Sequence, residues 1–275
     1  MNMDRIAYPR IYHIAAVAFL AAVACFFLNP FLAALPLAAF LFACLLAPFV
    51  PRWQLFLPVI TRGDRRSKNV ALTFDDGPDP ATTPLLLDLM AAHDIRATFF
   101  VIGDKAERHP DLIAHILEHG HTLGNHTMHH DSFLMLRTTA TLRLEIGQCQ
   151  EVLTRHGVQT LVFRPPVGIV NPRLAPELKR HNLDCILFNR RGNDFGNRRI
   201  DQLSAAIIKG LKAGDIIMLH DRPPSRGEPV SRLMHHVEVV IAGVRTAGLG
   251  VVPLERLIGK PVMVNTTKVV EKSTD

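Results

Sequence analysis

The chain has 275 residues, of which 48% are hydrophobic, and its 31 Lys and Arg against 25 Asp and Glu give a formal net charge of +6. This composition excludes an intrinsically disordered chain, a collagen-like fibre and a small disulfide-stapled domain. The positive charge is mild and is not arranged as a stripe, so we expect no nucleic-acid partner.

The N-terminal region, residues 1–50, has the composition of a membrane segment. No Asp, Glu, Lys or Arg occurs in the 40 positions from 11 to 50, and a helix of about 20 apolar residues suffices to cross a bilayer. Asn29 and Pro30 interrupt the middle of this stretch, and such a pair favours a turn. The sequence therefore predicts a hairpin of two transmembrane helices, over residues 11–28 and 31–50. A cleaved signal peptide is the alternative, although the apolar stretch is much longer than a signal core of about 7–15 residues.

Basic residues on both sides of this hairpin predict its orientation. Arg5 and Arg10 precede the first span, and five Lys or Arg residues lie within residues 51–69, which we interpret as a basic juxtamembrane linker. Because basic flanks are retained in the cytoplasm, the rest of the chain is expected on that side, with the linker against anionic membrane lipids. A single span with the following domain on the periplasmic side is the alternative.

Residues 70–259 alternate short β-rich runs with helical stretches, which predicts a parallel α/β sheet, either open or closed into a barrel. Most of the connections are short, as in βα units. The tail, residues 260–275, carries no motif. We expect strands at 70–74, 96–102, 121–125, 160–164, 184–188, 215–219 and 250–252, and helices at 83–93, 105–118, 138–155, 172–181, 201–212 and 230–246.

Reactive residue types follow the predicted strands at their carboxyl ends, where parallel α/β folds build their sites. Asp75 and Asp76 follow the first strand, and a His-rich segment follows the third. Five strand ends carry polar chemistry, which predicts one functional site at this edge of the sheet. The other residues are Arg164, Asp194 and His220, at the ends of the fourth, fifth and sixth strands.

The His-rich segment and the adjacent carboxylates predict a metal site. His126 and His130 are four residues apart, so on a helical turn they face the same way and can bind one ion. Taken alone, these features are ordinary: an Asp-Asp-Gly-Pro turn, and histidines packed in the fold. An Asp with two His, however, is the ligand set of a catalytic site with open positions, suited to zinc or another divalent ion. His129 is the rival ligand.

Together these motifs resemble the polysaccharide deacetylases that carry the NodB homology domain. The resemblance spans about residues 70–257. It implies a distorted (β/α)7-type barrel over residues 70–259 that uses a bound metal to hydrolyse N-acyl groups from amino sugars. The motifs, in that family's order, are Thr73-Phe74-Asp75-Asp76-Gly77-Pro78, His126-Thr127-Met128-His129-His130, Arg164-Pro165-Pro166-Val167-Gly168 and Leu219-His220-Asp221.

The resemblance implies a role for each motif residue. Asp76, His126 and His130 would bind the metal, with Zn²⁺ the expected ion and Co²⁺, Mn²⁺ or Fe²⁺ also compatible with such ligands. Asp75 would act as the general base toward the attacking water. The remaining implied roles are Arg164 as the partner of Asp75, the Val167 N–H as an oxyanion donor, His220 as the acid for the leaving amine, and Asp194 as the residue that orients His220.

Several positions differ from the family pattern, among them Phe195 in place of Trp and Met218 in place of Leu. Val167 stands where the family usually has Tyr, which keeps the backbone donor but removes an aromatic wall from the cleft. Arg191 reverses the charge at a position that normally supports Arg164, which predicts a disturbed contact between Arg164 and Asp75.

The arginines around this strand end, together with the hairpin, predict the substrate. Arg190, Arg191 and the pair at 198–199 would form an anion-binding rim, because Arg suits bidentate contact with phosphate; a solvated basic loop is the alternative. Phe195 and Met218 predict a small pocket for an acetyl or formyl group. We therefore expect an N-acylated amino sugar linked to a lipid phosphate, presented at the cytoplasmic face of a bacterial inner membrane. This resembles the lipid-linked amino-sugar branch of lipid A modification.

Three other functions fit the same residues. The first is an extracytoplasmic deacetylase of peptidoglycan, chitooligosaccharides or exopolysaccharide, and membrane topology separates it from the main expectation. The second is a catalytically impaired, membrane-tethered glycan-binding protein. The third is a metal-dependent hydrolase of another amide. The sequence predicts no particular oligomeric state.

Overall fold

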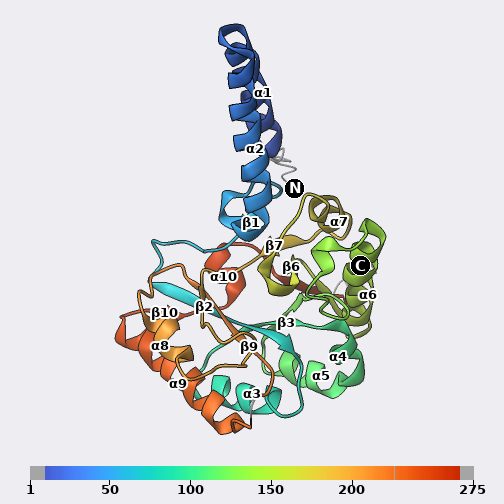
Figure 1. Ribbon diagram of the computed structural model, residues 1–275. Helices are drawn as coiled ribbons and strands as arrows, with labels where there is room; N and C mark the ends of the chain where they lie inside the picture. Colours follow the sequence, from blue (N-terminus) through green and yellow to red (C-terminus); the bar gives the residue numbers. More distant parts are fainter. Residues whose placement is uncertain (1–9, 226, 267–275) are drawn as a thin grey trace.

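A curled, almost entirely parallel sheet is the centre of the protein, a computed structural model of which describes residues 10–225 and 227–266 (Figure 1). The strand order is β1-β7-β6-β4-β3-β2-β9-β8, and β10 pairs in parallel with β2. Within the described residues, the terminal strands β1 and β8 do not pair with each other, so the barrel is open on that side. The strands are β1 (Val59–Ile60), β2 (Asn69–Gly77), β3 (Thr98–Val101), β4 (Thr122–Asn125), β5 (Val158–Thr160), β6 (Val162–Phe163), β7 (Asp184–Ile186), β8 (Arg190–Arg191), β9 (Ile216–His220), β10 (Gly250–Val251) and β11 (Met263–Asn265).

Helices cover the outer face of this sheet, and side chains from its own strands fill much of the inner face. Every residue of β3 and β4 is buried, as expected for parallel strands packed between two layers. The long helix α9 contributes Leu233, Val237 and Val240, whose spacing places them on one helical face. The helices of the domain are α3 (Thr83–Ala92), α4 (Gly103–Arg108), α5 (Pro110–Glu118), α6 (Thr139–Arg155), α7 (Leu174–Arg180), α8 (Leu203–Ile208), α9 (Val230–Thr246) and α10 (Leu254–Ile258).

Two elements expected from the sequence are divided in the structure. The helix predicted at 105–118 is α4 followed by α5, because Pro110 keeps His109 out of the helical region, with φ −130° and ψ 63°. The strand predicted at 160–164 is β5 followed by β6, separated at Leu161. The short elements β1, β8, β11 and α10 were not predicted, because two to five residues are too few to show a periodicity.

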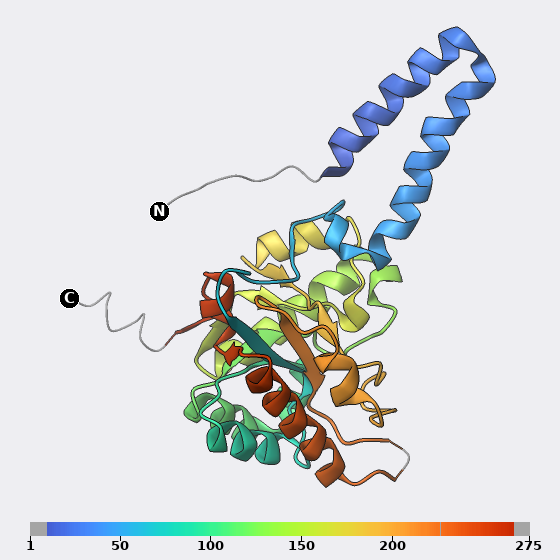
Figure 2. The same ribbon diagram turned by 90° about the vertical axis from the view of Figure 1, so that its left-hand side faces the viewer.

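A helical hairpin projects from the domain at its N-terminal end (Figures 1 and 2). Its helices are α1 (Arg10–Leu28) and α2 (Ala34–Leu46), joined through the 3-10 turn η1 (Pro30–Ala33). The side chain of Asn29 caps that turn by accepting a hydrogen bond from the Phe31 N–H at 2.9 Å. The segments Arg10–Leu28 and Pro30–Phe49 are long and apolar enough to cross a membrane. A helical hairpin is therefore present at the predicted positions, 11–28 and 31–50, and its insertion into a membrane stays a prediction.

The domain extends beyond both boundaries predicted for it. Residues expected to form a juxtamembrane linker are partly folded: Leu55, Phe56 and Leu57 are buried, and β1 pairs in parallel with β7. At the other end β11, within the predicted tail, pairs antiparallel with β5. Residues 267–275 of that tail lie outside the described part of the chain.

Candidate active site

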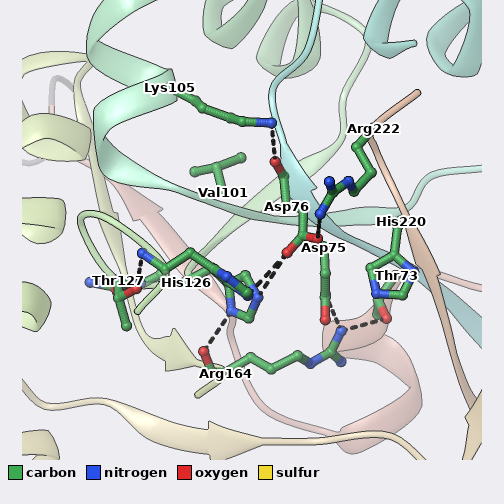
Figure 3. A network of polar contacts seen from close by, with 12 residues as sticks. Thr73, Asp75, Asp76, Val101, Lys105, His126, Thr127, Arg164, His220 and Arg222 are labelled. Carbon is green, nitrogen blue, oxygen red and sulfur yellow. Dashed lines mark hydrogen bonds and ion pairs between the residues drawn. The ribbon is translucent and has the colours of Figure 1, made fainter. Parts of the chain in front are cut away.

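Two neighbouring aspartates reach one cleft from the end of β2. In a regular strand, adjacent side chains point to opposite faces of the sheet. Here the register of β2 against β3 shifts between Asp75 and Gly77, and the backbone of Asp76 is left-handed with φ of 72°. This bulge turns Asp76 so that both carboxylates line the same cleft, as Figure 3 shows.

A buried carboxyl that directly follows β9 holds this bulge in place. Asp221 is fully buried and accepts hydrogen bonds from the hydroxyls of Thr82 and Thr83, each at 2.6 Å. Its own backbone N–H donates to the carbonyl of Asp75 at 2.7 Å. A Cβ atom at Gly77 would lie 2.2 Å from Asp221 Oδ2, so only glycine fits there. Burial raises the pKa of Asp221 to about 7.

Asp76, His126 and His130 form a cluster suited to a metal ion. Their potential ligand atoms all lie within 4.8 Å of one another. Asp76 Oδ1 is 3.2 Å from His130 Nε2 and 3.5 Å from His126 Nε2. His126 Nδ1 donates a hydrogen bond to the carbonyl of Arg164 at 2.7 Å, which in the neutral ring leaves Nε2 with a bare lone pair facing the carboxylate. Two acceptors facing each other in a buried site fit a bound cation, and the carbonyl is the outer partner that metal-binding histidines usually have.

The cluster is formed without the helical turn that the spacing predicted. Residues 126–130 are irregular, and Thr127 and His130 have left-handed φ values of 70° and 56°. The Thr127 N–H donates to Asn125 Oδ1 at 2.9 Å, and the His130 N–H donates to Thr127 Oγ1 at 3.0 Å. The expectation of a helical turn was wrong, although both histidines face the same aspartate.

His129, the rival ligand, does not belong to this cluster. Its Nδ1 lies 2.7 Å from Glu145 Oε1, and its side chain is more than half exposed. This pairing directs the ring of His129 toward α6 and away from Asp76.

Electrostatics in the cluster favour an ionised Asp76. Burial alone would raise the pKa of this carboxyl, but the surrounding histidines, His126 first and then His220 and His130, outweigh burial and lower the pKa below its usual range. Burial is also the main cause that lowers the pKa of His130. An ionised carboxylate and an imidazole that gives up its proton readily are the ligand states that a divalent cation requires.

Arg164 holds Asp75 from within the core of the sheet. The guanidinium is fully buried and its NH1 lies 2.5 Å from Asp75 Oδ1. The same NH1 donates to the hydroxyl of Thr73 at 2.9 Å, while Nε and NH2 donate to the carbonyls of Ile186 and Leu187. Within the described residues, Asp75 Oδ2 makes no hydrogen bond, so one oxygen is fixed and the other is free in the cleft.

Arg191 does not disturb this pair. The contact between Arg164 and Asp75 is intact, because backbone carbonyls and Thr73 satisfy the rest of the guanidinium. Arg191 itself lines the cleft, where its guanidinium lies 5.7 Å from the ring centre of Phe188. The disturbance expected from the reversed charge is therefore absent.

His220 and Asp194 form a second pair on the other side of the cleft. Asp194 Oδ2 accepts a hydrogen bond from His220 Nδ1 at 2.7 Å. Burial alone would lower the pKa of His220, but the hydrogen bond and the charge of Asp194 outweigh it, so this pKa lies above its usual value. Burial would likewise raise the pKa of Asp194, and its bond to His220 lowers it instead. The pair can therefore keep a proton on His220 near neutral pH.

The predicted substrate-contacting residues are only partly confirmed as cleft residues. The cleft has a volume of about 430 Å³ and is lined by Arg191, Phe195, Met218 and Val167. Arg190 is not part of it: its Nε lies 2.8 Å from Asp215 Oδ2 and its NH1 donates to the Lys209 carbonyl. The prediction of Arg190 as a rim residue was wrong, because successive residues of β8 face opposite sides.

Two basic side chains that contact Asp76 of the candidate metal site were not predicted from the sequence. Arg222 NH1 lies 3.4 Å from Asp76 Oδ2, and Lys105 Nζ donates to the Asp76 carbonyl at 2.8 Å (Figure 3). Arg198 also lines the cleft. Arg222 directly follows the His220-Asp221 motif, and Lys105 follows the end of β3. Both residues therefore lie after the carboxyl end of a strand, which is the pattern that identified the other site residues.

Comparison with known proteins identifies the family. A polysaccharide deacetylase family profile matches residues 62–186. A peptidoglycan-N-acetylglucosamine deacetylase of Bacillus cereus is 34% identical over 168 residues, which cover 60% of this chain and 78% of that protein. The chain belongs to the polysaccharide deacetylase family. A chitooligosaccharide deacetylase of Sinorhizobium fredii is 32% identical over 179 residues, which cover 62% of this chain and 79% of that protein.

Solved structures of polysaccharide deacetylases have the same fold. A peptidoglycan N-acetylglucosamine deacetylase, solved in complex with 4-naphthalen-1-yl-N-oxidanyl-benzamide, superimposes with a TM-score of 0.67 and 28% identity, over 74% of this chain and 94% of that one. The predicted family, the distorted parallel α/β barrel and the enzyme class, a carbohydrate N-deacetylase, are thereby confirmed. Neither the lipid-linked substrate nor the cytoplasmic orientation gains support from these relatives.

Proposed function

We propose that this polysaccharide deacetylase removes the acetyl group from N-acetylated amino sugars of a peptidoglycan or chitooligosaccharide type, with a divalent metal at Asp76, His126 and His130. One observation carries the proposal: this cluster shares a cleft with the free oxygen of Asp75 and with the pair of His220 and Asp194. The activities of the similar deacetylases from Bacillus cereus and Sinorhizobium fredii support the same substrate class. This was the alternative, and not the main, expectation from the sequence.

The candidate metal site and Asp75 have different roles in the attack of water on the amide. A divalent cation held there would polarise the amide carbonyl and make a water molecule easier to deprotonate. Asp75 accepts the proton of the attacking water on Oδ2, since Oδ1 is held by Arg164. Arg164 stabilises the ionised form of Asp75 before the proton arrives. Because Arg164 has no exposed surface, it fixes the direction of the carboxylate and does not contact the sugar.

His220 and Val167 act on the other side of the amide. His220 donates its proton from Nε2 to the nitrogen of the leaving amine as the C–N bond breaks, while Asp194 holds Nδ1. Val167 lines the cleft with a left-handed backbone, φ 54° and ψ 8°. Its N–H stabilises the negative charge that develops on the carbonyl oxygen. One such donor is worth about 3 kcal/mol of barrier.

The pocket beside these groups supports a short acyl group. Met218 is buried under the cleft, and Phe195 lies at its surface with 69% of its side chain exposed. An apolar floor and an aromatic edge suit a methyl group. Acetyl is therefore the expected acyl group, with formyl as the smaller alternative.

A second candidate substrate is an amino sugar carried on a lipid phosphate. Arg191 and Arg198 line the cleft, and in the described part of the chain neither forms an ion pair with a carboxylate. Both are free to contact an anion, and the hairpin would hold the cleft close to lipid. This candidate predicts that Arg191→Ala and Arg198→Ala lower turnover of a phosphate-linked sugar and spare a neutral one. Arg245→Ala, on α9, is the matched control.

Acetate release tests the main proposal. The full chain in lipid nanodiscs is supplied with N-acetylated chitooligosaccharides or peptidoglycan fragments, before and after metal removal with a chelator. We expect release that stops without metal and returns when Zn²⁺ or another divalent ion is restored. A metal-loaded, folded protein that deacetylates neither glycan would overturn the proposal.

A further inference from the structure

The loop that begins after the metal-cluster residue His130 exposes two large apolar side chains. Residues 131–137 contain the 3-10 turn η4 (Leu134–Leu136). Leu134 and Met135 are buried, whereas Phe133 is 65% exposed and Leu136 is 80% exposed. Single exposed apolar residues are ordinary on a protein surface, but two in one short loop form a patch that calls for a partner.

Hydrogen bonds hold this loop in a fixed shape. Asp131 accepts one from the Phe133 N–H at 2.8 Å and another from Arg137 Nε at 2.7 Å. Asn171 and Arg173 both donate to the carbonyl of Met135 at 2.8 Å. Phe133 and Leu136 are therefore presented outward by a braced turn and are not exposed through disorder of the loop.

The same turn is packed against the base of the hairpin. Leu134 and Met135 belong to one buried cluster with Ala47, which follows α2, and with Leu55 and Phe56. In Figure 2 the lime-coloured segment that runs into α6 lies beside the lower end of the hairpin. The apolar patch thus continues the surface from which the membrane-length helices project.

The hairpin base carries the residue types found where a membrane meets water. Phe49 is 69% exposed and Trp53 is 42% exposed at the point where the chain leaves α2. Trp is enriched at this level because its ring is amphipathic, and Phe and Leu are among the side chains that interfacial segments bury at the headgroup boundary. Phe133 and Leu136, beside this base, can reach the same layer.

We propose that Phe133 and Leu136 insert into the headgroup region of the bilayer that holds the hairpin, so that the loop 131–137 is a second membrane contact. Ser132 in the same loop lines the catalytic cleft. The contact therefore holds the mouth of the cleft at the membrane surface. Resting on the proposed function, this selects amino sugars presented at the membrane surface over those of distant glycan.

The single tryptophan of the chain, Trp53, makes the contact measurable. The full chain is reconstituted in phosphatidylcholine and phosphatidylglycerol vesicles that contain lipids spin-labelled near the headgroup. In a Trp53→Phe background, Phe133→Trp and Leu136→Trp should lose fluorescence as strongly as native Trp53 does. Leu85→Trp is the matched control, because Leu85 is 43% exposed on α3, at the end of the domain opposite the hairpin (Figure 1). Quenching at 133 and 136 no stronger than at 85, or no quenching of native Trp53, would overturn the membrane contact.

A pair of substrates tests the consequence for catalysis. The double variant Phe133→Ser, Leu136→Ser should deacetylate a soluble chitooligosaccharide at the wild-type rate, and the same oligosaccharide on a lipid anchor several-fold more slowly. Equal rates on the anchored substrate, or an equal loss on both, would remove the loop from substrate selection. If wild-type protein releases acetate from neither substrate, the proposed function fails, while the quenching result still decides the membrane contact.

Discussion

Asp75 and Asp76 are neighbours in the chain, yet the structure gives them different partners. Asp75 is held by Arg164 from the core, with one oxygen free, whereas Asp76 faces two imidazoles and Arg222. Two carboxylates in one site are tolerable only when each has its own positive partner. This separation of partners supports the separate roles that we propose, Asp75 in proton transfer and Asp76 in metal binding.

Asn substitutions at the two positions should therefore fail in different ways. Asp75→Asn removes the proton acceptor and should lower kcat by about 10²–10⁴-fold with the bound metal retained. Asp76→Asn removes a charged ligand and should lower metal content first. Acetate release together with metal content by mass spectrometry, on protein checked for an intact fold, separates them. Equal metal loss in both variants would contradict the division of roles.

The pair of Asp194 and His220 predicts a change in pH dependence. Burial lowers the pKa of His220, and the hydrogen bond and charge of Asp194 more than reverse this. A proton donor with a raised pKa stays protonated as the pH increases, and activity falls once the pH passes that pKa. In Asp194→Asn the charge of Asp194 is lost and only the charges of Asp76 and Asp75 still oppose burial, so the pKa of His220 should fall and the alkaline limb of kcat/KM should move to lower pH. A pH profile with an unmoved alkaline limb, at reduced rate, would exclude His220 as the acid.

At the scale of elements, the sequence predicted the strands whose ends carry the site residues. It did not predict the strands that are too short to show a hydrophobic periodicity. Polar residues at the ends of β2, β4, β6 and β9 identified the site edge correctly, because parallel strands bring their carboxyl ends together. The strand β8 could not be predicted because it has only two residues. For the same reason the sequence did not show that its side chains alternate, so that Arg190 pairs with Asp215 and Arg191 lines the cleft. The bulge at Asp76 was equally invisible, since it depends on Asp221, 145 positions later.

The helix α6 supports the metal-cluster segment and offers a test of stability separate from chemistry. Its N-cap Thr138 accepts a hydrogen bond from the Thr141 N–H at 3.1 Å. Ile146 of this helix accepts from Asn125 at the end of β4. Thr138→Ala should lower the free energy of unfolding by about 1 kcal/mol and leave kcat unchanged, and Thr138→Ser should restore stability. Chemical denaturation of the detergent-solubilised protein measures both; an unchanged midpoint in the Ala variant would contradict the cap.

At the scale of the whole molecule, the predicted transmembrane hairpin would determine on which side of the membrane the enzyme works. Two antiparallel helices that both cross the bilayer would return the chain to the side where it began and place Arg10 and the catalytic domain in one compartment. The basic flanks predicted the cytoplasm, whereas a peptidoglycan substrate requires the outer side. Substrate access and the positive-inside rule therefore predict opposite orientations of the hairpin.

A reporter fused after Asp275 decides between them. On the proposed function we expect the reporter to be active outside the cytoplasm, and a protease added to intact spheroplasts to reach the domain. We expect this location because the catalytic cleft can act only on glycans in its own compartment. A reporter active only in the cytoplasm would remove peptidoglycan from the substrate class. The same catalytic residues, with Arg191 and Arg198 at the rim, would then be assigned to an amino sugar on a lipid phosphate at the inner leaflet.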